Sequence, residues 1–168
     1  MNDIVDYLTR AYLIAADESD DPHTQNGAIL INQHGLVLGE AANAFPDGVI
    51  LDSTRMAGPI KYSYMEHAER NAIYQAAKVG RRIKGSTLYA AWAACTDCAR
   101  AIIQSGVATL VRHHPEWMPS PSEEWVESIS IADQMMSEAG IEIITYSEAL
   151  PDAPDVMRHG KIWSPSGV

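Results

Sequence analysis

Apolar residues recur every three or four positions from about Ile4 to Asp17, which predicts an amphipathic helix with one buried stripe. Two short apolar runs follow, over residues 28–32 and 36–40, and the three residues between them predict a β-hairpin. The next stretch, Ala41–Pro59, is rich in Gly, Pro, Asn and Asp and is too long for a simple connection. Because such loops in compact domains are commonly functional, we expect it to form a wall of a substrate site.

The second half of the chain alternates between helical and strand patterns. Helical spacing resumes over Glu66–Val79 and stops at Gly80. The elements expected after it are a strand over 86–92, a helix over 96–105, a strand over 107–112, a helix over 122–139 and a strand over 141–146. This alternation predicts a layered α/β domain with helices on both faces of one sheet. We expect this domain to span residues 1–146, followed by a C-terminal tail over 147–168 that is loosely packed from Pro151.

The charge balance narrows the range of partners. Twelve Lys and Arg residues stand against 22 Asp and Glu residues, for a net charge of −10. Such a surface repels a phosphate backbone, so we expect no polynucleotide partner, although one or two Arg, His or backbone N–H groups suffice for a single phosphate. The chain has no apolar run of membrane-spanning length and no signal-peptide pattern, so we expect a cytoplasmic protein without a membrane partner.

Residues with metal-binding chemistry cluster in two short motifs. The first is H-A-E, with His67 and Glu69 at the start of one predicted helix, and the second is C-T-D-C, with Cys95 and Cys98 around the first turn of the next. Residues three apart in a helix project to one side, so both thiolates can reach one ion. Parallel neighbouring strands would bring both helix starts to one sheet edge, where α/β folds place their sites. We therefore expect zinc as the cofactor, with His67, Cys95 and Cys98 as its ligands.

An open coordination position indicates catalysis rather than structure. Three protein ligands leave the fourth tetrahedral position for water, and zinc lowers the pKa of that water to about 7. A zinc-bound hydroxide can then attack an amidine-like ring carbon. Glu69, which lies beside a ligand without being one, can move the proton to the ring nitrogen and to the leaving ammonia. H-x-E followed by C-x-x-C is the known signature of zinc deaminases that act on nucleobases.

Each motif alone has a simpler interpretation. A lone C-x-x-C pair is most often redox-active or half of a structural zinc site, and a lone H-x-E is usually a polar helix surface. A non-catalytic nucleotide-binding module that keeps zinc only for folding is therefore an alternative. The two motifs together favour the enzyme, because the chain has no further Cys to close a structural site and because a proton shuttle has no use there.

The residues around these motifs resemble the deoxycytidylate (dCMP) deaminases of the cytidine deaminase superfamily, over nearly all of residues 20–144. The matching segments are D-P-x-x-Q-x-G-A over residues 21–28, N-x-x-P-x-G over 43–48, K-Y-x-Y-x-x-H-A-E-x-N-A-I over 61–73 and C-x-x-C-A-x-x-I-I-Q-x-G over 95–106.

This resemblance implies a three-layer α/β/α fold with a mixed five-stranded sheet, conversion of dCMP to dUMP with release of ammonia, and a homo-oligomer. It implies the same zinc ligands as above, with Glu69 as the catalytic proton shuttle. Asn43 is expected to line the pocket of the deoxynucleotide substrate, near its sugar. The other substrate-binding candidates are Thr24, Asn71, Ala68, Pro46 and His113, the last of which follows a predicted strand and is a candidate for the phosphate.

Two departures from the family pattern bear on the pocket and on regulation. Ala94 replaces the proline usual before the first zinc cysteine, so we expect a slightly altered pocket. Gly39–Ala44 lacks the Gly-Tyr-Asn-Gly pattern that allosteric members use near their triphosphate site, so regulation by dCTP and dTTP is not expected.

The substrate itself has alternatives. The same chemistry on cytidine, CMP, dCTP, guanine or a tRNA adenosine is the nearest one, although the net charge argues against tRNA. Trp92 and Trp125 are interpreted as core anchors.

Overall fold

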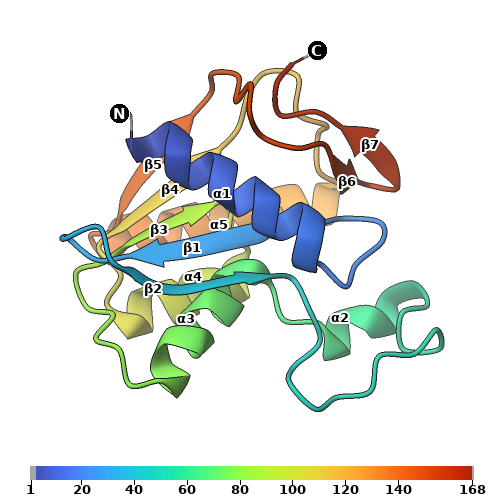
Figure 1. The fold of residues 1–168 in the computed structure, drawn as a ribbon, viewed down its shortest axis with the longest axis horizontal. Coiled ribbons are helices and arrows are strands. Elements are labelled where there is room, and N and C mark those ends of the chain that lie inside the picture. The colour runs from blue at the N-terminus through green and yellow to red at the C-terminus, as the bar shows by residue number, and fades with distance from the viewer. Residues whose placement is uncertain (1–2, 168) are drawn as a thin grey trace.

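The computed structural model of this chain describes residues 3–167, apart from the side chains of Asp3 and Glu124, and Figure 1 shows its fold. The elements in chain order are α1 (Asp3–Glu18), β1 (Gly27–Ile31), β2 (Val37–Ala42), a 3₁₀ turn (Gly58–Ile60), α2 (Lys61–Tyr64), α3 (Ala68–Lys78), β3 (Thr87–Ala90), α4 (Thr96–Ser105), β4 (Thr109–His113), α5 (Glu123–Glu138), β5 (Glu142–Tyr146), β6 (Val156–Arg158) and β7 (Lys161–Trp163). The helices and strands expected up to residue 146 are all present, and α2 is an addition.

The expected mixed five-stranded sheet is confirmed, with strand order β2-β1-β3-β4-β5. β1 is antiparallel to both of its neighbours, whereas β3, β4 and β5 are parallel. β2 and β3 therefore run in the same direction, and their last residues, Ala42 and Ala90, pair with Gly27 and Ala28 at the start of β1. The chain thus leaves β2 and β3 at the same edge of the sheet. The expected cause was parallel neighbouring strands, but β2 and β3 are not neighbours, because the antiparallel strand β1 lies between them.

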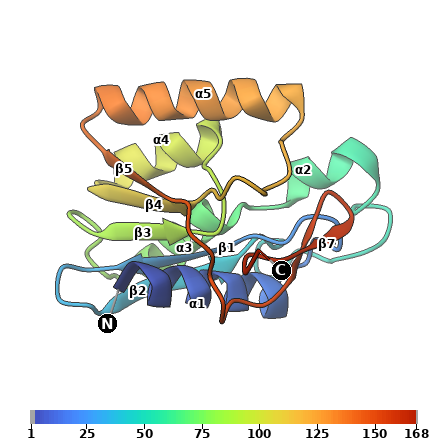
Figure 2. The same ribbon diagram turned by 90° about the horizontal axis from the view of Figure 1, so that it is seen from above.

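Side chains alternate across this sheet and build a core on each face. In β1, Ala28 and Leu30 belong to the cluster that packs under α3, α4 and α5, whereas Ile29 and Ile31 belong to the cluster under α1. Figure 2 shows α4 and α5 on one side of the sheet and α1 on the other. The three-layer α/β/α arrangement follows directly from this two-sided apolar pattern.

Two glycines let helices approach the sheet more closely than any other residue would allow. A Cβ added to Gly39 on β2 would overlap the backbone carbonyl of Ala72 on α3, and one added to Gly27 on β1 would overlap that of Ala11 on α1. The positions of α1 and α3 on the sheet therefore depend on these two missing side chains.

The segment after residue 146 is not loosely packed, contrary to expectation. β6 and β7 pair as an antiparallel hairpin, and Val156 and Trp163 are buried in the apolar cluster under α1. The backbone of Met157 also forms two hydrogen bonds of 2.9 Å with Gln25, one through the Gln25 backbone N–H and one through its side-chain oxygen. The hairpin is thereby attached to the residues that precede β1.

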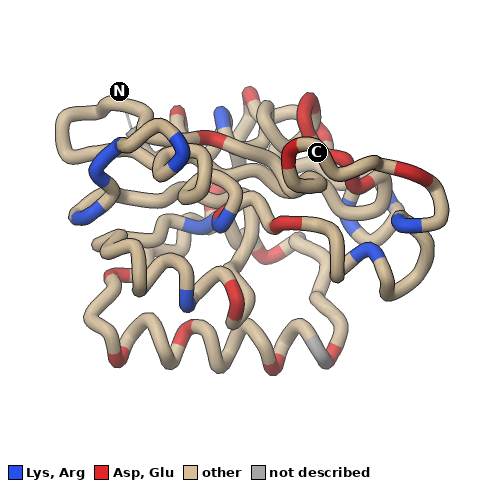
Figure 3. Tube along the Cα trace, turned by 90° about the horizontal axis from the view of Figure 1, so that it is seen from below, with Lys and Arg blue, Asp and Glu red and all other residues tan. Residues whose placement is uncertain are grey.

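Charge is unevenly distributed over the surface. Figure 3 shows acidic residues along α5, which contains no Lys or Arg between Glu123 and Glu138. None of the helices within residues 3–167 combines the length and apolar character needed to cross a membrane.

Candidate active site

Two helix starts meet at the edge where β2 and β3 end. His67 is the N-cap of α3 and Cys95 is the N-cap of α4, and both have the extended backbone typical of that position. Cys98 lies in the first turn of α4. Because the positive ends of both helix dipoles point at this place, it favours negatively charged ligands such as thiolates.

The ligand atoms form a triangle that matches one face of a zinc tetrahedron. Nδ1 of His67 lies 3.4 Å from Sγ of Cys95 and 3.6 Å from Sγ of Cys98, and the two sulfur atoms are 3.6 Å apart. Zinc–sulfur bonds of about 2.3 Å and zinc–nitrogen bonds of about 2.0 Å at tetrahedral angles imply edges of about 3.5 to 3.8 Å. The three residues therefore fit zinc, as the sequence predicts.

The surroundings of the sulfur pair stabilise negative charge. The hydrogen bond from Cys98, followed by that from His67, lowers the pKa of the Cys95 thiol to about 3 despite burial, while the same sulfur contact and burial raise the pKa of Cys98. Nη1 of Arg70 lies 3.9 Å from Sγ of Cys98, and its Nε donates to Glu66 at 2.6 Å, so a fixed positive charge lies beside the sulfur atoms.

Glu69 lies beside this triangle and is almost completely buried, with 1% of its surface exposed. Its Oε2 is 3.7 Å from Sγ of Cys98 and accepts a hydrogen bond of 3.4 Å from Nδ2 of Asn26. Burial raises the pKa of the Glu69 carboxyl, and the nearby His67 opposes part of that effect. Oδ1 of Asn26 is buried and has no hydrogen-bond partner within the described chain, so it offers an acceptor to a ligand.

A cavity adjoins the triangle and has an aromatic lining. Tyr62, Trp92 and Trp125 contribute to its walls together with His67 and Glu69. The ring centres of Trp125 and His67 are 5.6 Å apart. The two tryptophans are partly buried. Trp92 packs against the apolar cluster under α1 and Trp125 against the cluster under α3, α4 and α5, as expected of core anchors, and each also lines the cavity.

Asn43 lines the same cavity and organises the residues around it. Its Oδ1 accepts hydrogen bonds of 2.7 Å from the backbone N–H of Asn26 and from the Ser19 hydroxyl. Its Nδ2 donates to the Thr24 carbonyl at 2.8 Å and contacts the sulfur of Met65 at 3.6 Å. A thioether is a weak acceptor, so one amide N–H of Asn43 is available to a ligand.

The other substrate-binding candidates divide into two groups. Thr24 lines the cavity. The side chains of Asn71, Ala68 and Pro46 do not: Asn71 donates to the Ala42 carbonyl at 3.1 Å, Ala68 is fully buried against the sheet, and Pro46 is exposed. Most of the loop 41–59 also lies away from the cavity, and only its Asn43 lines it.

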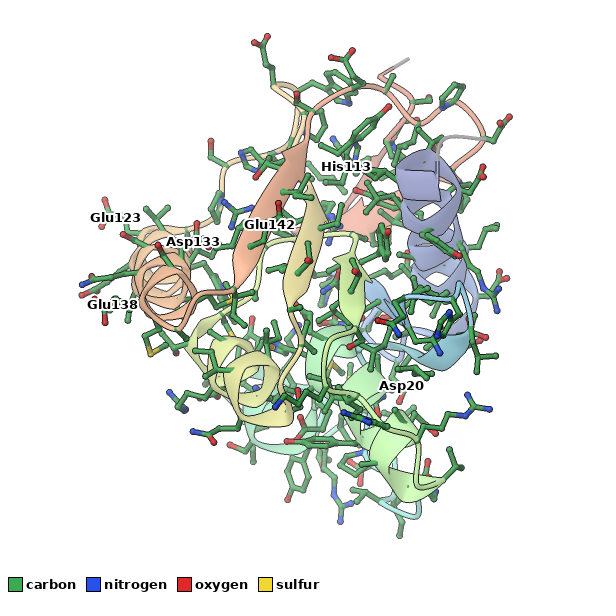
Figure 4. The ribbon with its side chains drawn as sticks, turned by 90° about the vertical axis from the view of Figure 1, so that its left-hand side faces the viewer. Asp20, His113, Glu123, Asp133, Glu138 and Glu142 are labelled. Carbon is green, nitrogen blue, oxygen red and sulfur yellow. The ribbon has the colours of Figure 1, made fainter. Side chains whose placement is uncertain are left out.

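His113 is a structural residue rather than a phosphate contact. It is fully buried on the α1 side of the sheet, where Figure 4 labels it at the end of β4. Its Nδ1 is 2.8 Å from the Tyr12 hydroxyl and its Nε2 is 2.9 Å from the Glu148 carbonyl oxygen. Because both ring nitrogens are engaged inside the core, the expectation that this residue meets substrate is corrected.

Sequence reasoning missed the contribution of the C-terminal hairpin. His159, on the turn between β6 and β7, lines the cavity, and its ring contacts Trp92 edge-on at 5.3 Å between ring centres. The three-residue strands on either side of the turn carry too little pattern to be recognised, and the hairpin reaches the site only by folding back over α1.

Comparisons with known proteins point in the same direction. The family model described as the cytidine and deoxycytidylate deaminase zinc-binding region matches residues 1–114. A deaminase of unassigned substrate, from the luxG 3′ region of Aliivibrio fischeri, is 34% identical over 125 residues, which cover 74% of this chain and 81% of that protein. The deoxycytidylate deaminase of Homo sapiens is 33% identical over 112 residues, so the match spans 63% of this chain and 62% of the human protein, less than two thirds of either.

Solved structures share the fold. The dCMP deaminase of cyanophage S-TIM5, crystallised with dCMP and dUMP, aligns with a TM-score of 0.65 at 22% identity, over 87% of this chain and 98% of that chain. Its apo form aligns with a TM-score of 0.62 at 24% identity.

Proposed function

Because this chain belongs to the family of cytidine and deoxycytidylate deaminases, we propose that it hydrolyses dCMP to dUMP and ammonia. The observation that carries the proposal is the triangle of His67, Cys95 and Cys98, with Glu69 beside it and an aromatic cavity adjoining both. The family relatives that are named deoxycytidylate deaminases support the choice of dCMP among the possible substrates.

The zinc triangle defines the reacting end of the site. His67, Cys95 and Cys98 would hold the ion, which when bound supplies a Lewis acid that activates water for attack on the ring carbon bearing the amino group. Arg70 favours the thiolate form of Cys98 by placing its guanidinium beside that sulfur. Residues that orient and charge the ligands in this way commonly tune the affinity of a metal site.

Glu69 would move protons during the reaction. Its Oε2 lies close enough to the ligand sulfur of Cys98 to reach the same space as the attacking water. In this role the carboxylate accepts one proton from the attacking water and passes it to the ring nitrogen, where it stays. It then moves the second proton of that water to the amino group, which leaves as ammonia as the C–N bond breaks and the carbonyl forms. Asn26 donates to the same oxygen and keeps the carboxylate oriented.

The cavity suits a planar base that carries a sugar. Tyr62, Trp92 and Trp125 present apolar ring surfaces against which a pyrimidine can pack. The buried Oδ1 of Asn26 can accept a hydrogen bond from the substrate, and the free amide N–H of Asn43 can donate one to a sugar hydroxyl.

A substrate panel tests the proposal directly. The purified zinc-loaded protein is incubated with dCMP, CMP, cytidine, deoxycytidine and dCTP, and ammonia release is followed. We expect the highest kcat/KM for dCMP. If dCMP is inert while another compound turns over, the assigned substrate is wrong although the chemistry stands.

Glu69→Gln tests the proton transfer, because glutamine preserves the shape of the side chain and its contact with Asn26. We expect one zinc per chain, an unchanged melting temperature, and a kcat about 10²–10⁴-fold lower. Activity near that of the wild type would remove Glu69 from the mechanism. A protein that lacks activity on every substrate in both forms would support the alternative of a non-catalytic zinc module.

Other amino-heterocycles remain the nearest alternative substrates. A tRNA adenosine is the least favoured of them, because α5 contributes Trp125 and Ile129 to the cavity and carries no basic residue with which to approach a phosphate backbone (Figure 3). We also propose a homo-oligomer, which light scattering would contradict by finding a species of 18.4 kDa.

A further inference from the structure

We propose that His159, on the turn between β6 and β7, binds the phosphate group of the substrate. This inference rests on the proposed function, since it assigns a residue to the phosphate end of the same nucleotide. The residue lies in the C-terminal hairpin, outside residues 1–114, which match the family model.

The backbone of the turn holds the histidine in a left-handed conformation that glycine and asparagine adopt more readily. His159 and Gly160 connect the paired residues Arg158 and Lys161, with φ values of +52° and +75°. Two-residue turns with positive φ at both positions favour Asn-Gly. His159 is the one non-glycine residue with positive φ in residues 3–167. A strained residue of this kind at the edge of a cavity points to a role for its side chain in ligand binding.

The charge distribution of the cavity leaves His159 as the group that can meet an anion. Among the described residues that line the cavity there is no Lys or Arg, and the only other histidine is the zinc ligand His67. Lys61 is nearby, but it is buried and its Nζ is paired with Asp21 at 2.7 Å. Apart from the zinc ligand His67, the imidazole of His159 is therefore the one described lining group that can both donate a hydrogen bond to a phosphate and carry a positive charge.

A buried arginine makes this part of the cavity electropositive. Arg158 is 1% exposed, and its guanidinium lies over the ring of Trp92, 4.2 Å from the ring centre. It donates to the carbonyls of Gln25 at 2.9 Å and Ala91 at 3.1 Å, and its Nε has no hydrogen-bond partner. Within the described chain it forms no ion pair with a carboxylate. Its charge therefore favours an anion at the adjacent turn.

A chain of hydrogen bonds leads from the reacting end of the site to the turn. Glu69 accepts from the side chain of Asn26, whose backbone N–H donates to Asn43. Asn43 donates to the carbonyl of Thr24, and the Thr24 hydroxyl accepts from the backbone N–H of His159 at 3.3 Å. Base, sugar and phosphate follow one another in the same order in a nucleotide, so the phosphate would lie at the turn.

His159→Asn separates binding from folding, because asparagine suits the turn better than histidine while removing the imidazole. We expect kcat/KM for dCMP to fall roughly 10- to 100-fold, as for loss of a charge-assisted hydrogen bond, with no change for deoxycytidine. Calorimetric titration of the zinc-loaded protein with dUMP should show the same loss of affinity, and titration with deoxyuridine should show none. The melting temperature should be equal or higher.

His34→Asn is the matched control, since His34 is exposed on the β1–β2 turn, and it should leave all these values unchanged. If His159→Asn lowers the use of dCMP and deoxycytidine equally, or keeps the wild-type preference for dCMP, the inference is overturned while the proposed function stands. If the wild-type protein itself shows no preference for dCMP over deoxycytidine, the proposed function fails, and the inference fails with it.

Discussion

Gly39→Ala would disturb the active site through the middle of α3. The added Cβ would overlap the carbonyl oxygen of Ala72 by roughly 1 Å relative to an ordinary carbon–oxygen contact of about 3.3 Å, and it would lie 3.1 Å from the backbone nitrogen of Ala76. Both neighbours are helix backbone, so no side chain can rotate away. Helix α3 must therefore move off the sheet by roughly the overlap.

The size of the effect follows from this displacement. Overpacking of this kind costs about 1–3 kcal/mol, which for a chain of this size lowers the melting temperature by about 2–12 °C. His67 and Glu69 move with α3, whereas Cys95 and Cys98 stay with α4. A displacement of about 1 Å at reacting groups can lower the rate about 100-fold. We therefore expect a much larger loss of kcat and of zinc affinity than the melting temperature alone would indicate.

Gly27→Ala provides the comparison, because its Cβ would overlap the carbonyl of Ala11 on α1 to a similar extent. Since α1 carries none of the zinc ligands, we expect a similar loss of stability but less than a tenfold loss of kcat. Thermal melting, zinc content and ammonia release are measured for both variants. Equal losses of activity in the two proteins, or an unperturbed Gly39→Ala protein, would refute the link between this close contact and the site.

Three further predictions follow from the site and the core. Removal of zinc by a chelator should abolish activity and lower the melting temperature, and adding zinc should restore both. If zinc was present at 1,000 times its dissociation constant, the free energy of unfolding should fall by about 4 kcal/mol. Activity without zinc would contradict the mechanism. Arg70→Met should weaken zinc binding about 10- to 100-fold in a chelator competition, because the charge beside Cys98 is lost, and unchanged binding would contradict that role. Burial lowers the pKa of His113 from 6.5 to about 4, so between these pH values the unfolded chain binds a proton at this residue and the folded chain does not. The free energy of unfolding should therefore fall by about 1.4 kcal/mol per pH unit as the pH drops from 6.5 towards 4. An imidazole NMR signal of His113 that titrates near pH 6.5 would refute this.

The metal triangle could be predicted from sequence because its determinants are local. His67 and Cys95 each begin a helix, Cys98 follows one turn later, and the helix pattern that places them is strong. The alternation of strand and helix also sufficed for the layers, since each face of the sheet has its own apolar set. The helix pattern and the two short motifs therefore suffice to predict most of the residues at the reacting end of the site.

The rest of the cavity depends on contacts between distant segments. Trp92 and Trp125 pack against the core as their apolar character predicts, but only the folded chain shows that each also lines the cavity. Arg158 would ordinarily be assigned to the surface, yet the stacking on Trp92 and two carbonyl partners hold it inside. The burial of His113 also depends on a distant residue, because the hydroxyl of Tyr12, 101 positions away, hydrogen-bonds its ring inside the core.

The C-terminal hairpin also has a consequence for the order in which the protein matures on the ribosome. The last zinc ligand is residue 98, and the strand that completes the hairpin ends at residue 163, so 65 residues (163 − 98) separate them. At about 5–20 residues per second, their synthesis takes about 3 to 13 s. During that interval a nascent chain contains the three residues expected to bind zinc but not His159, which lines the cavity. The topology of the chain thus separates the synthesis of the metal ligands in time from that of the hairpin.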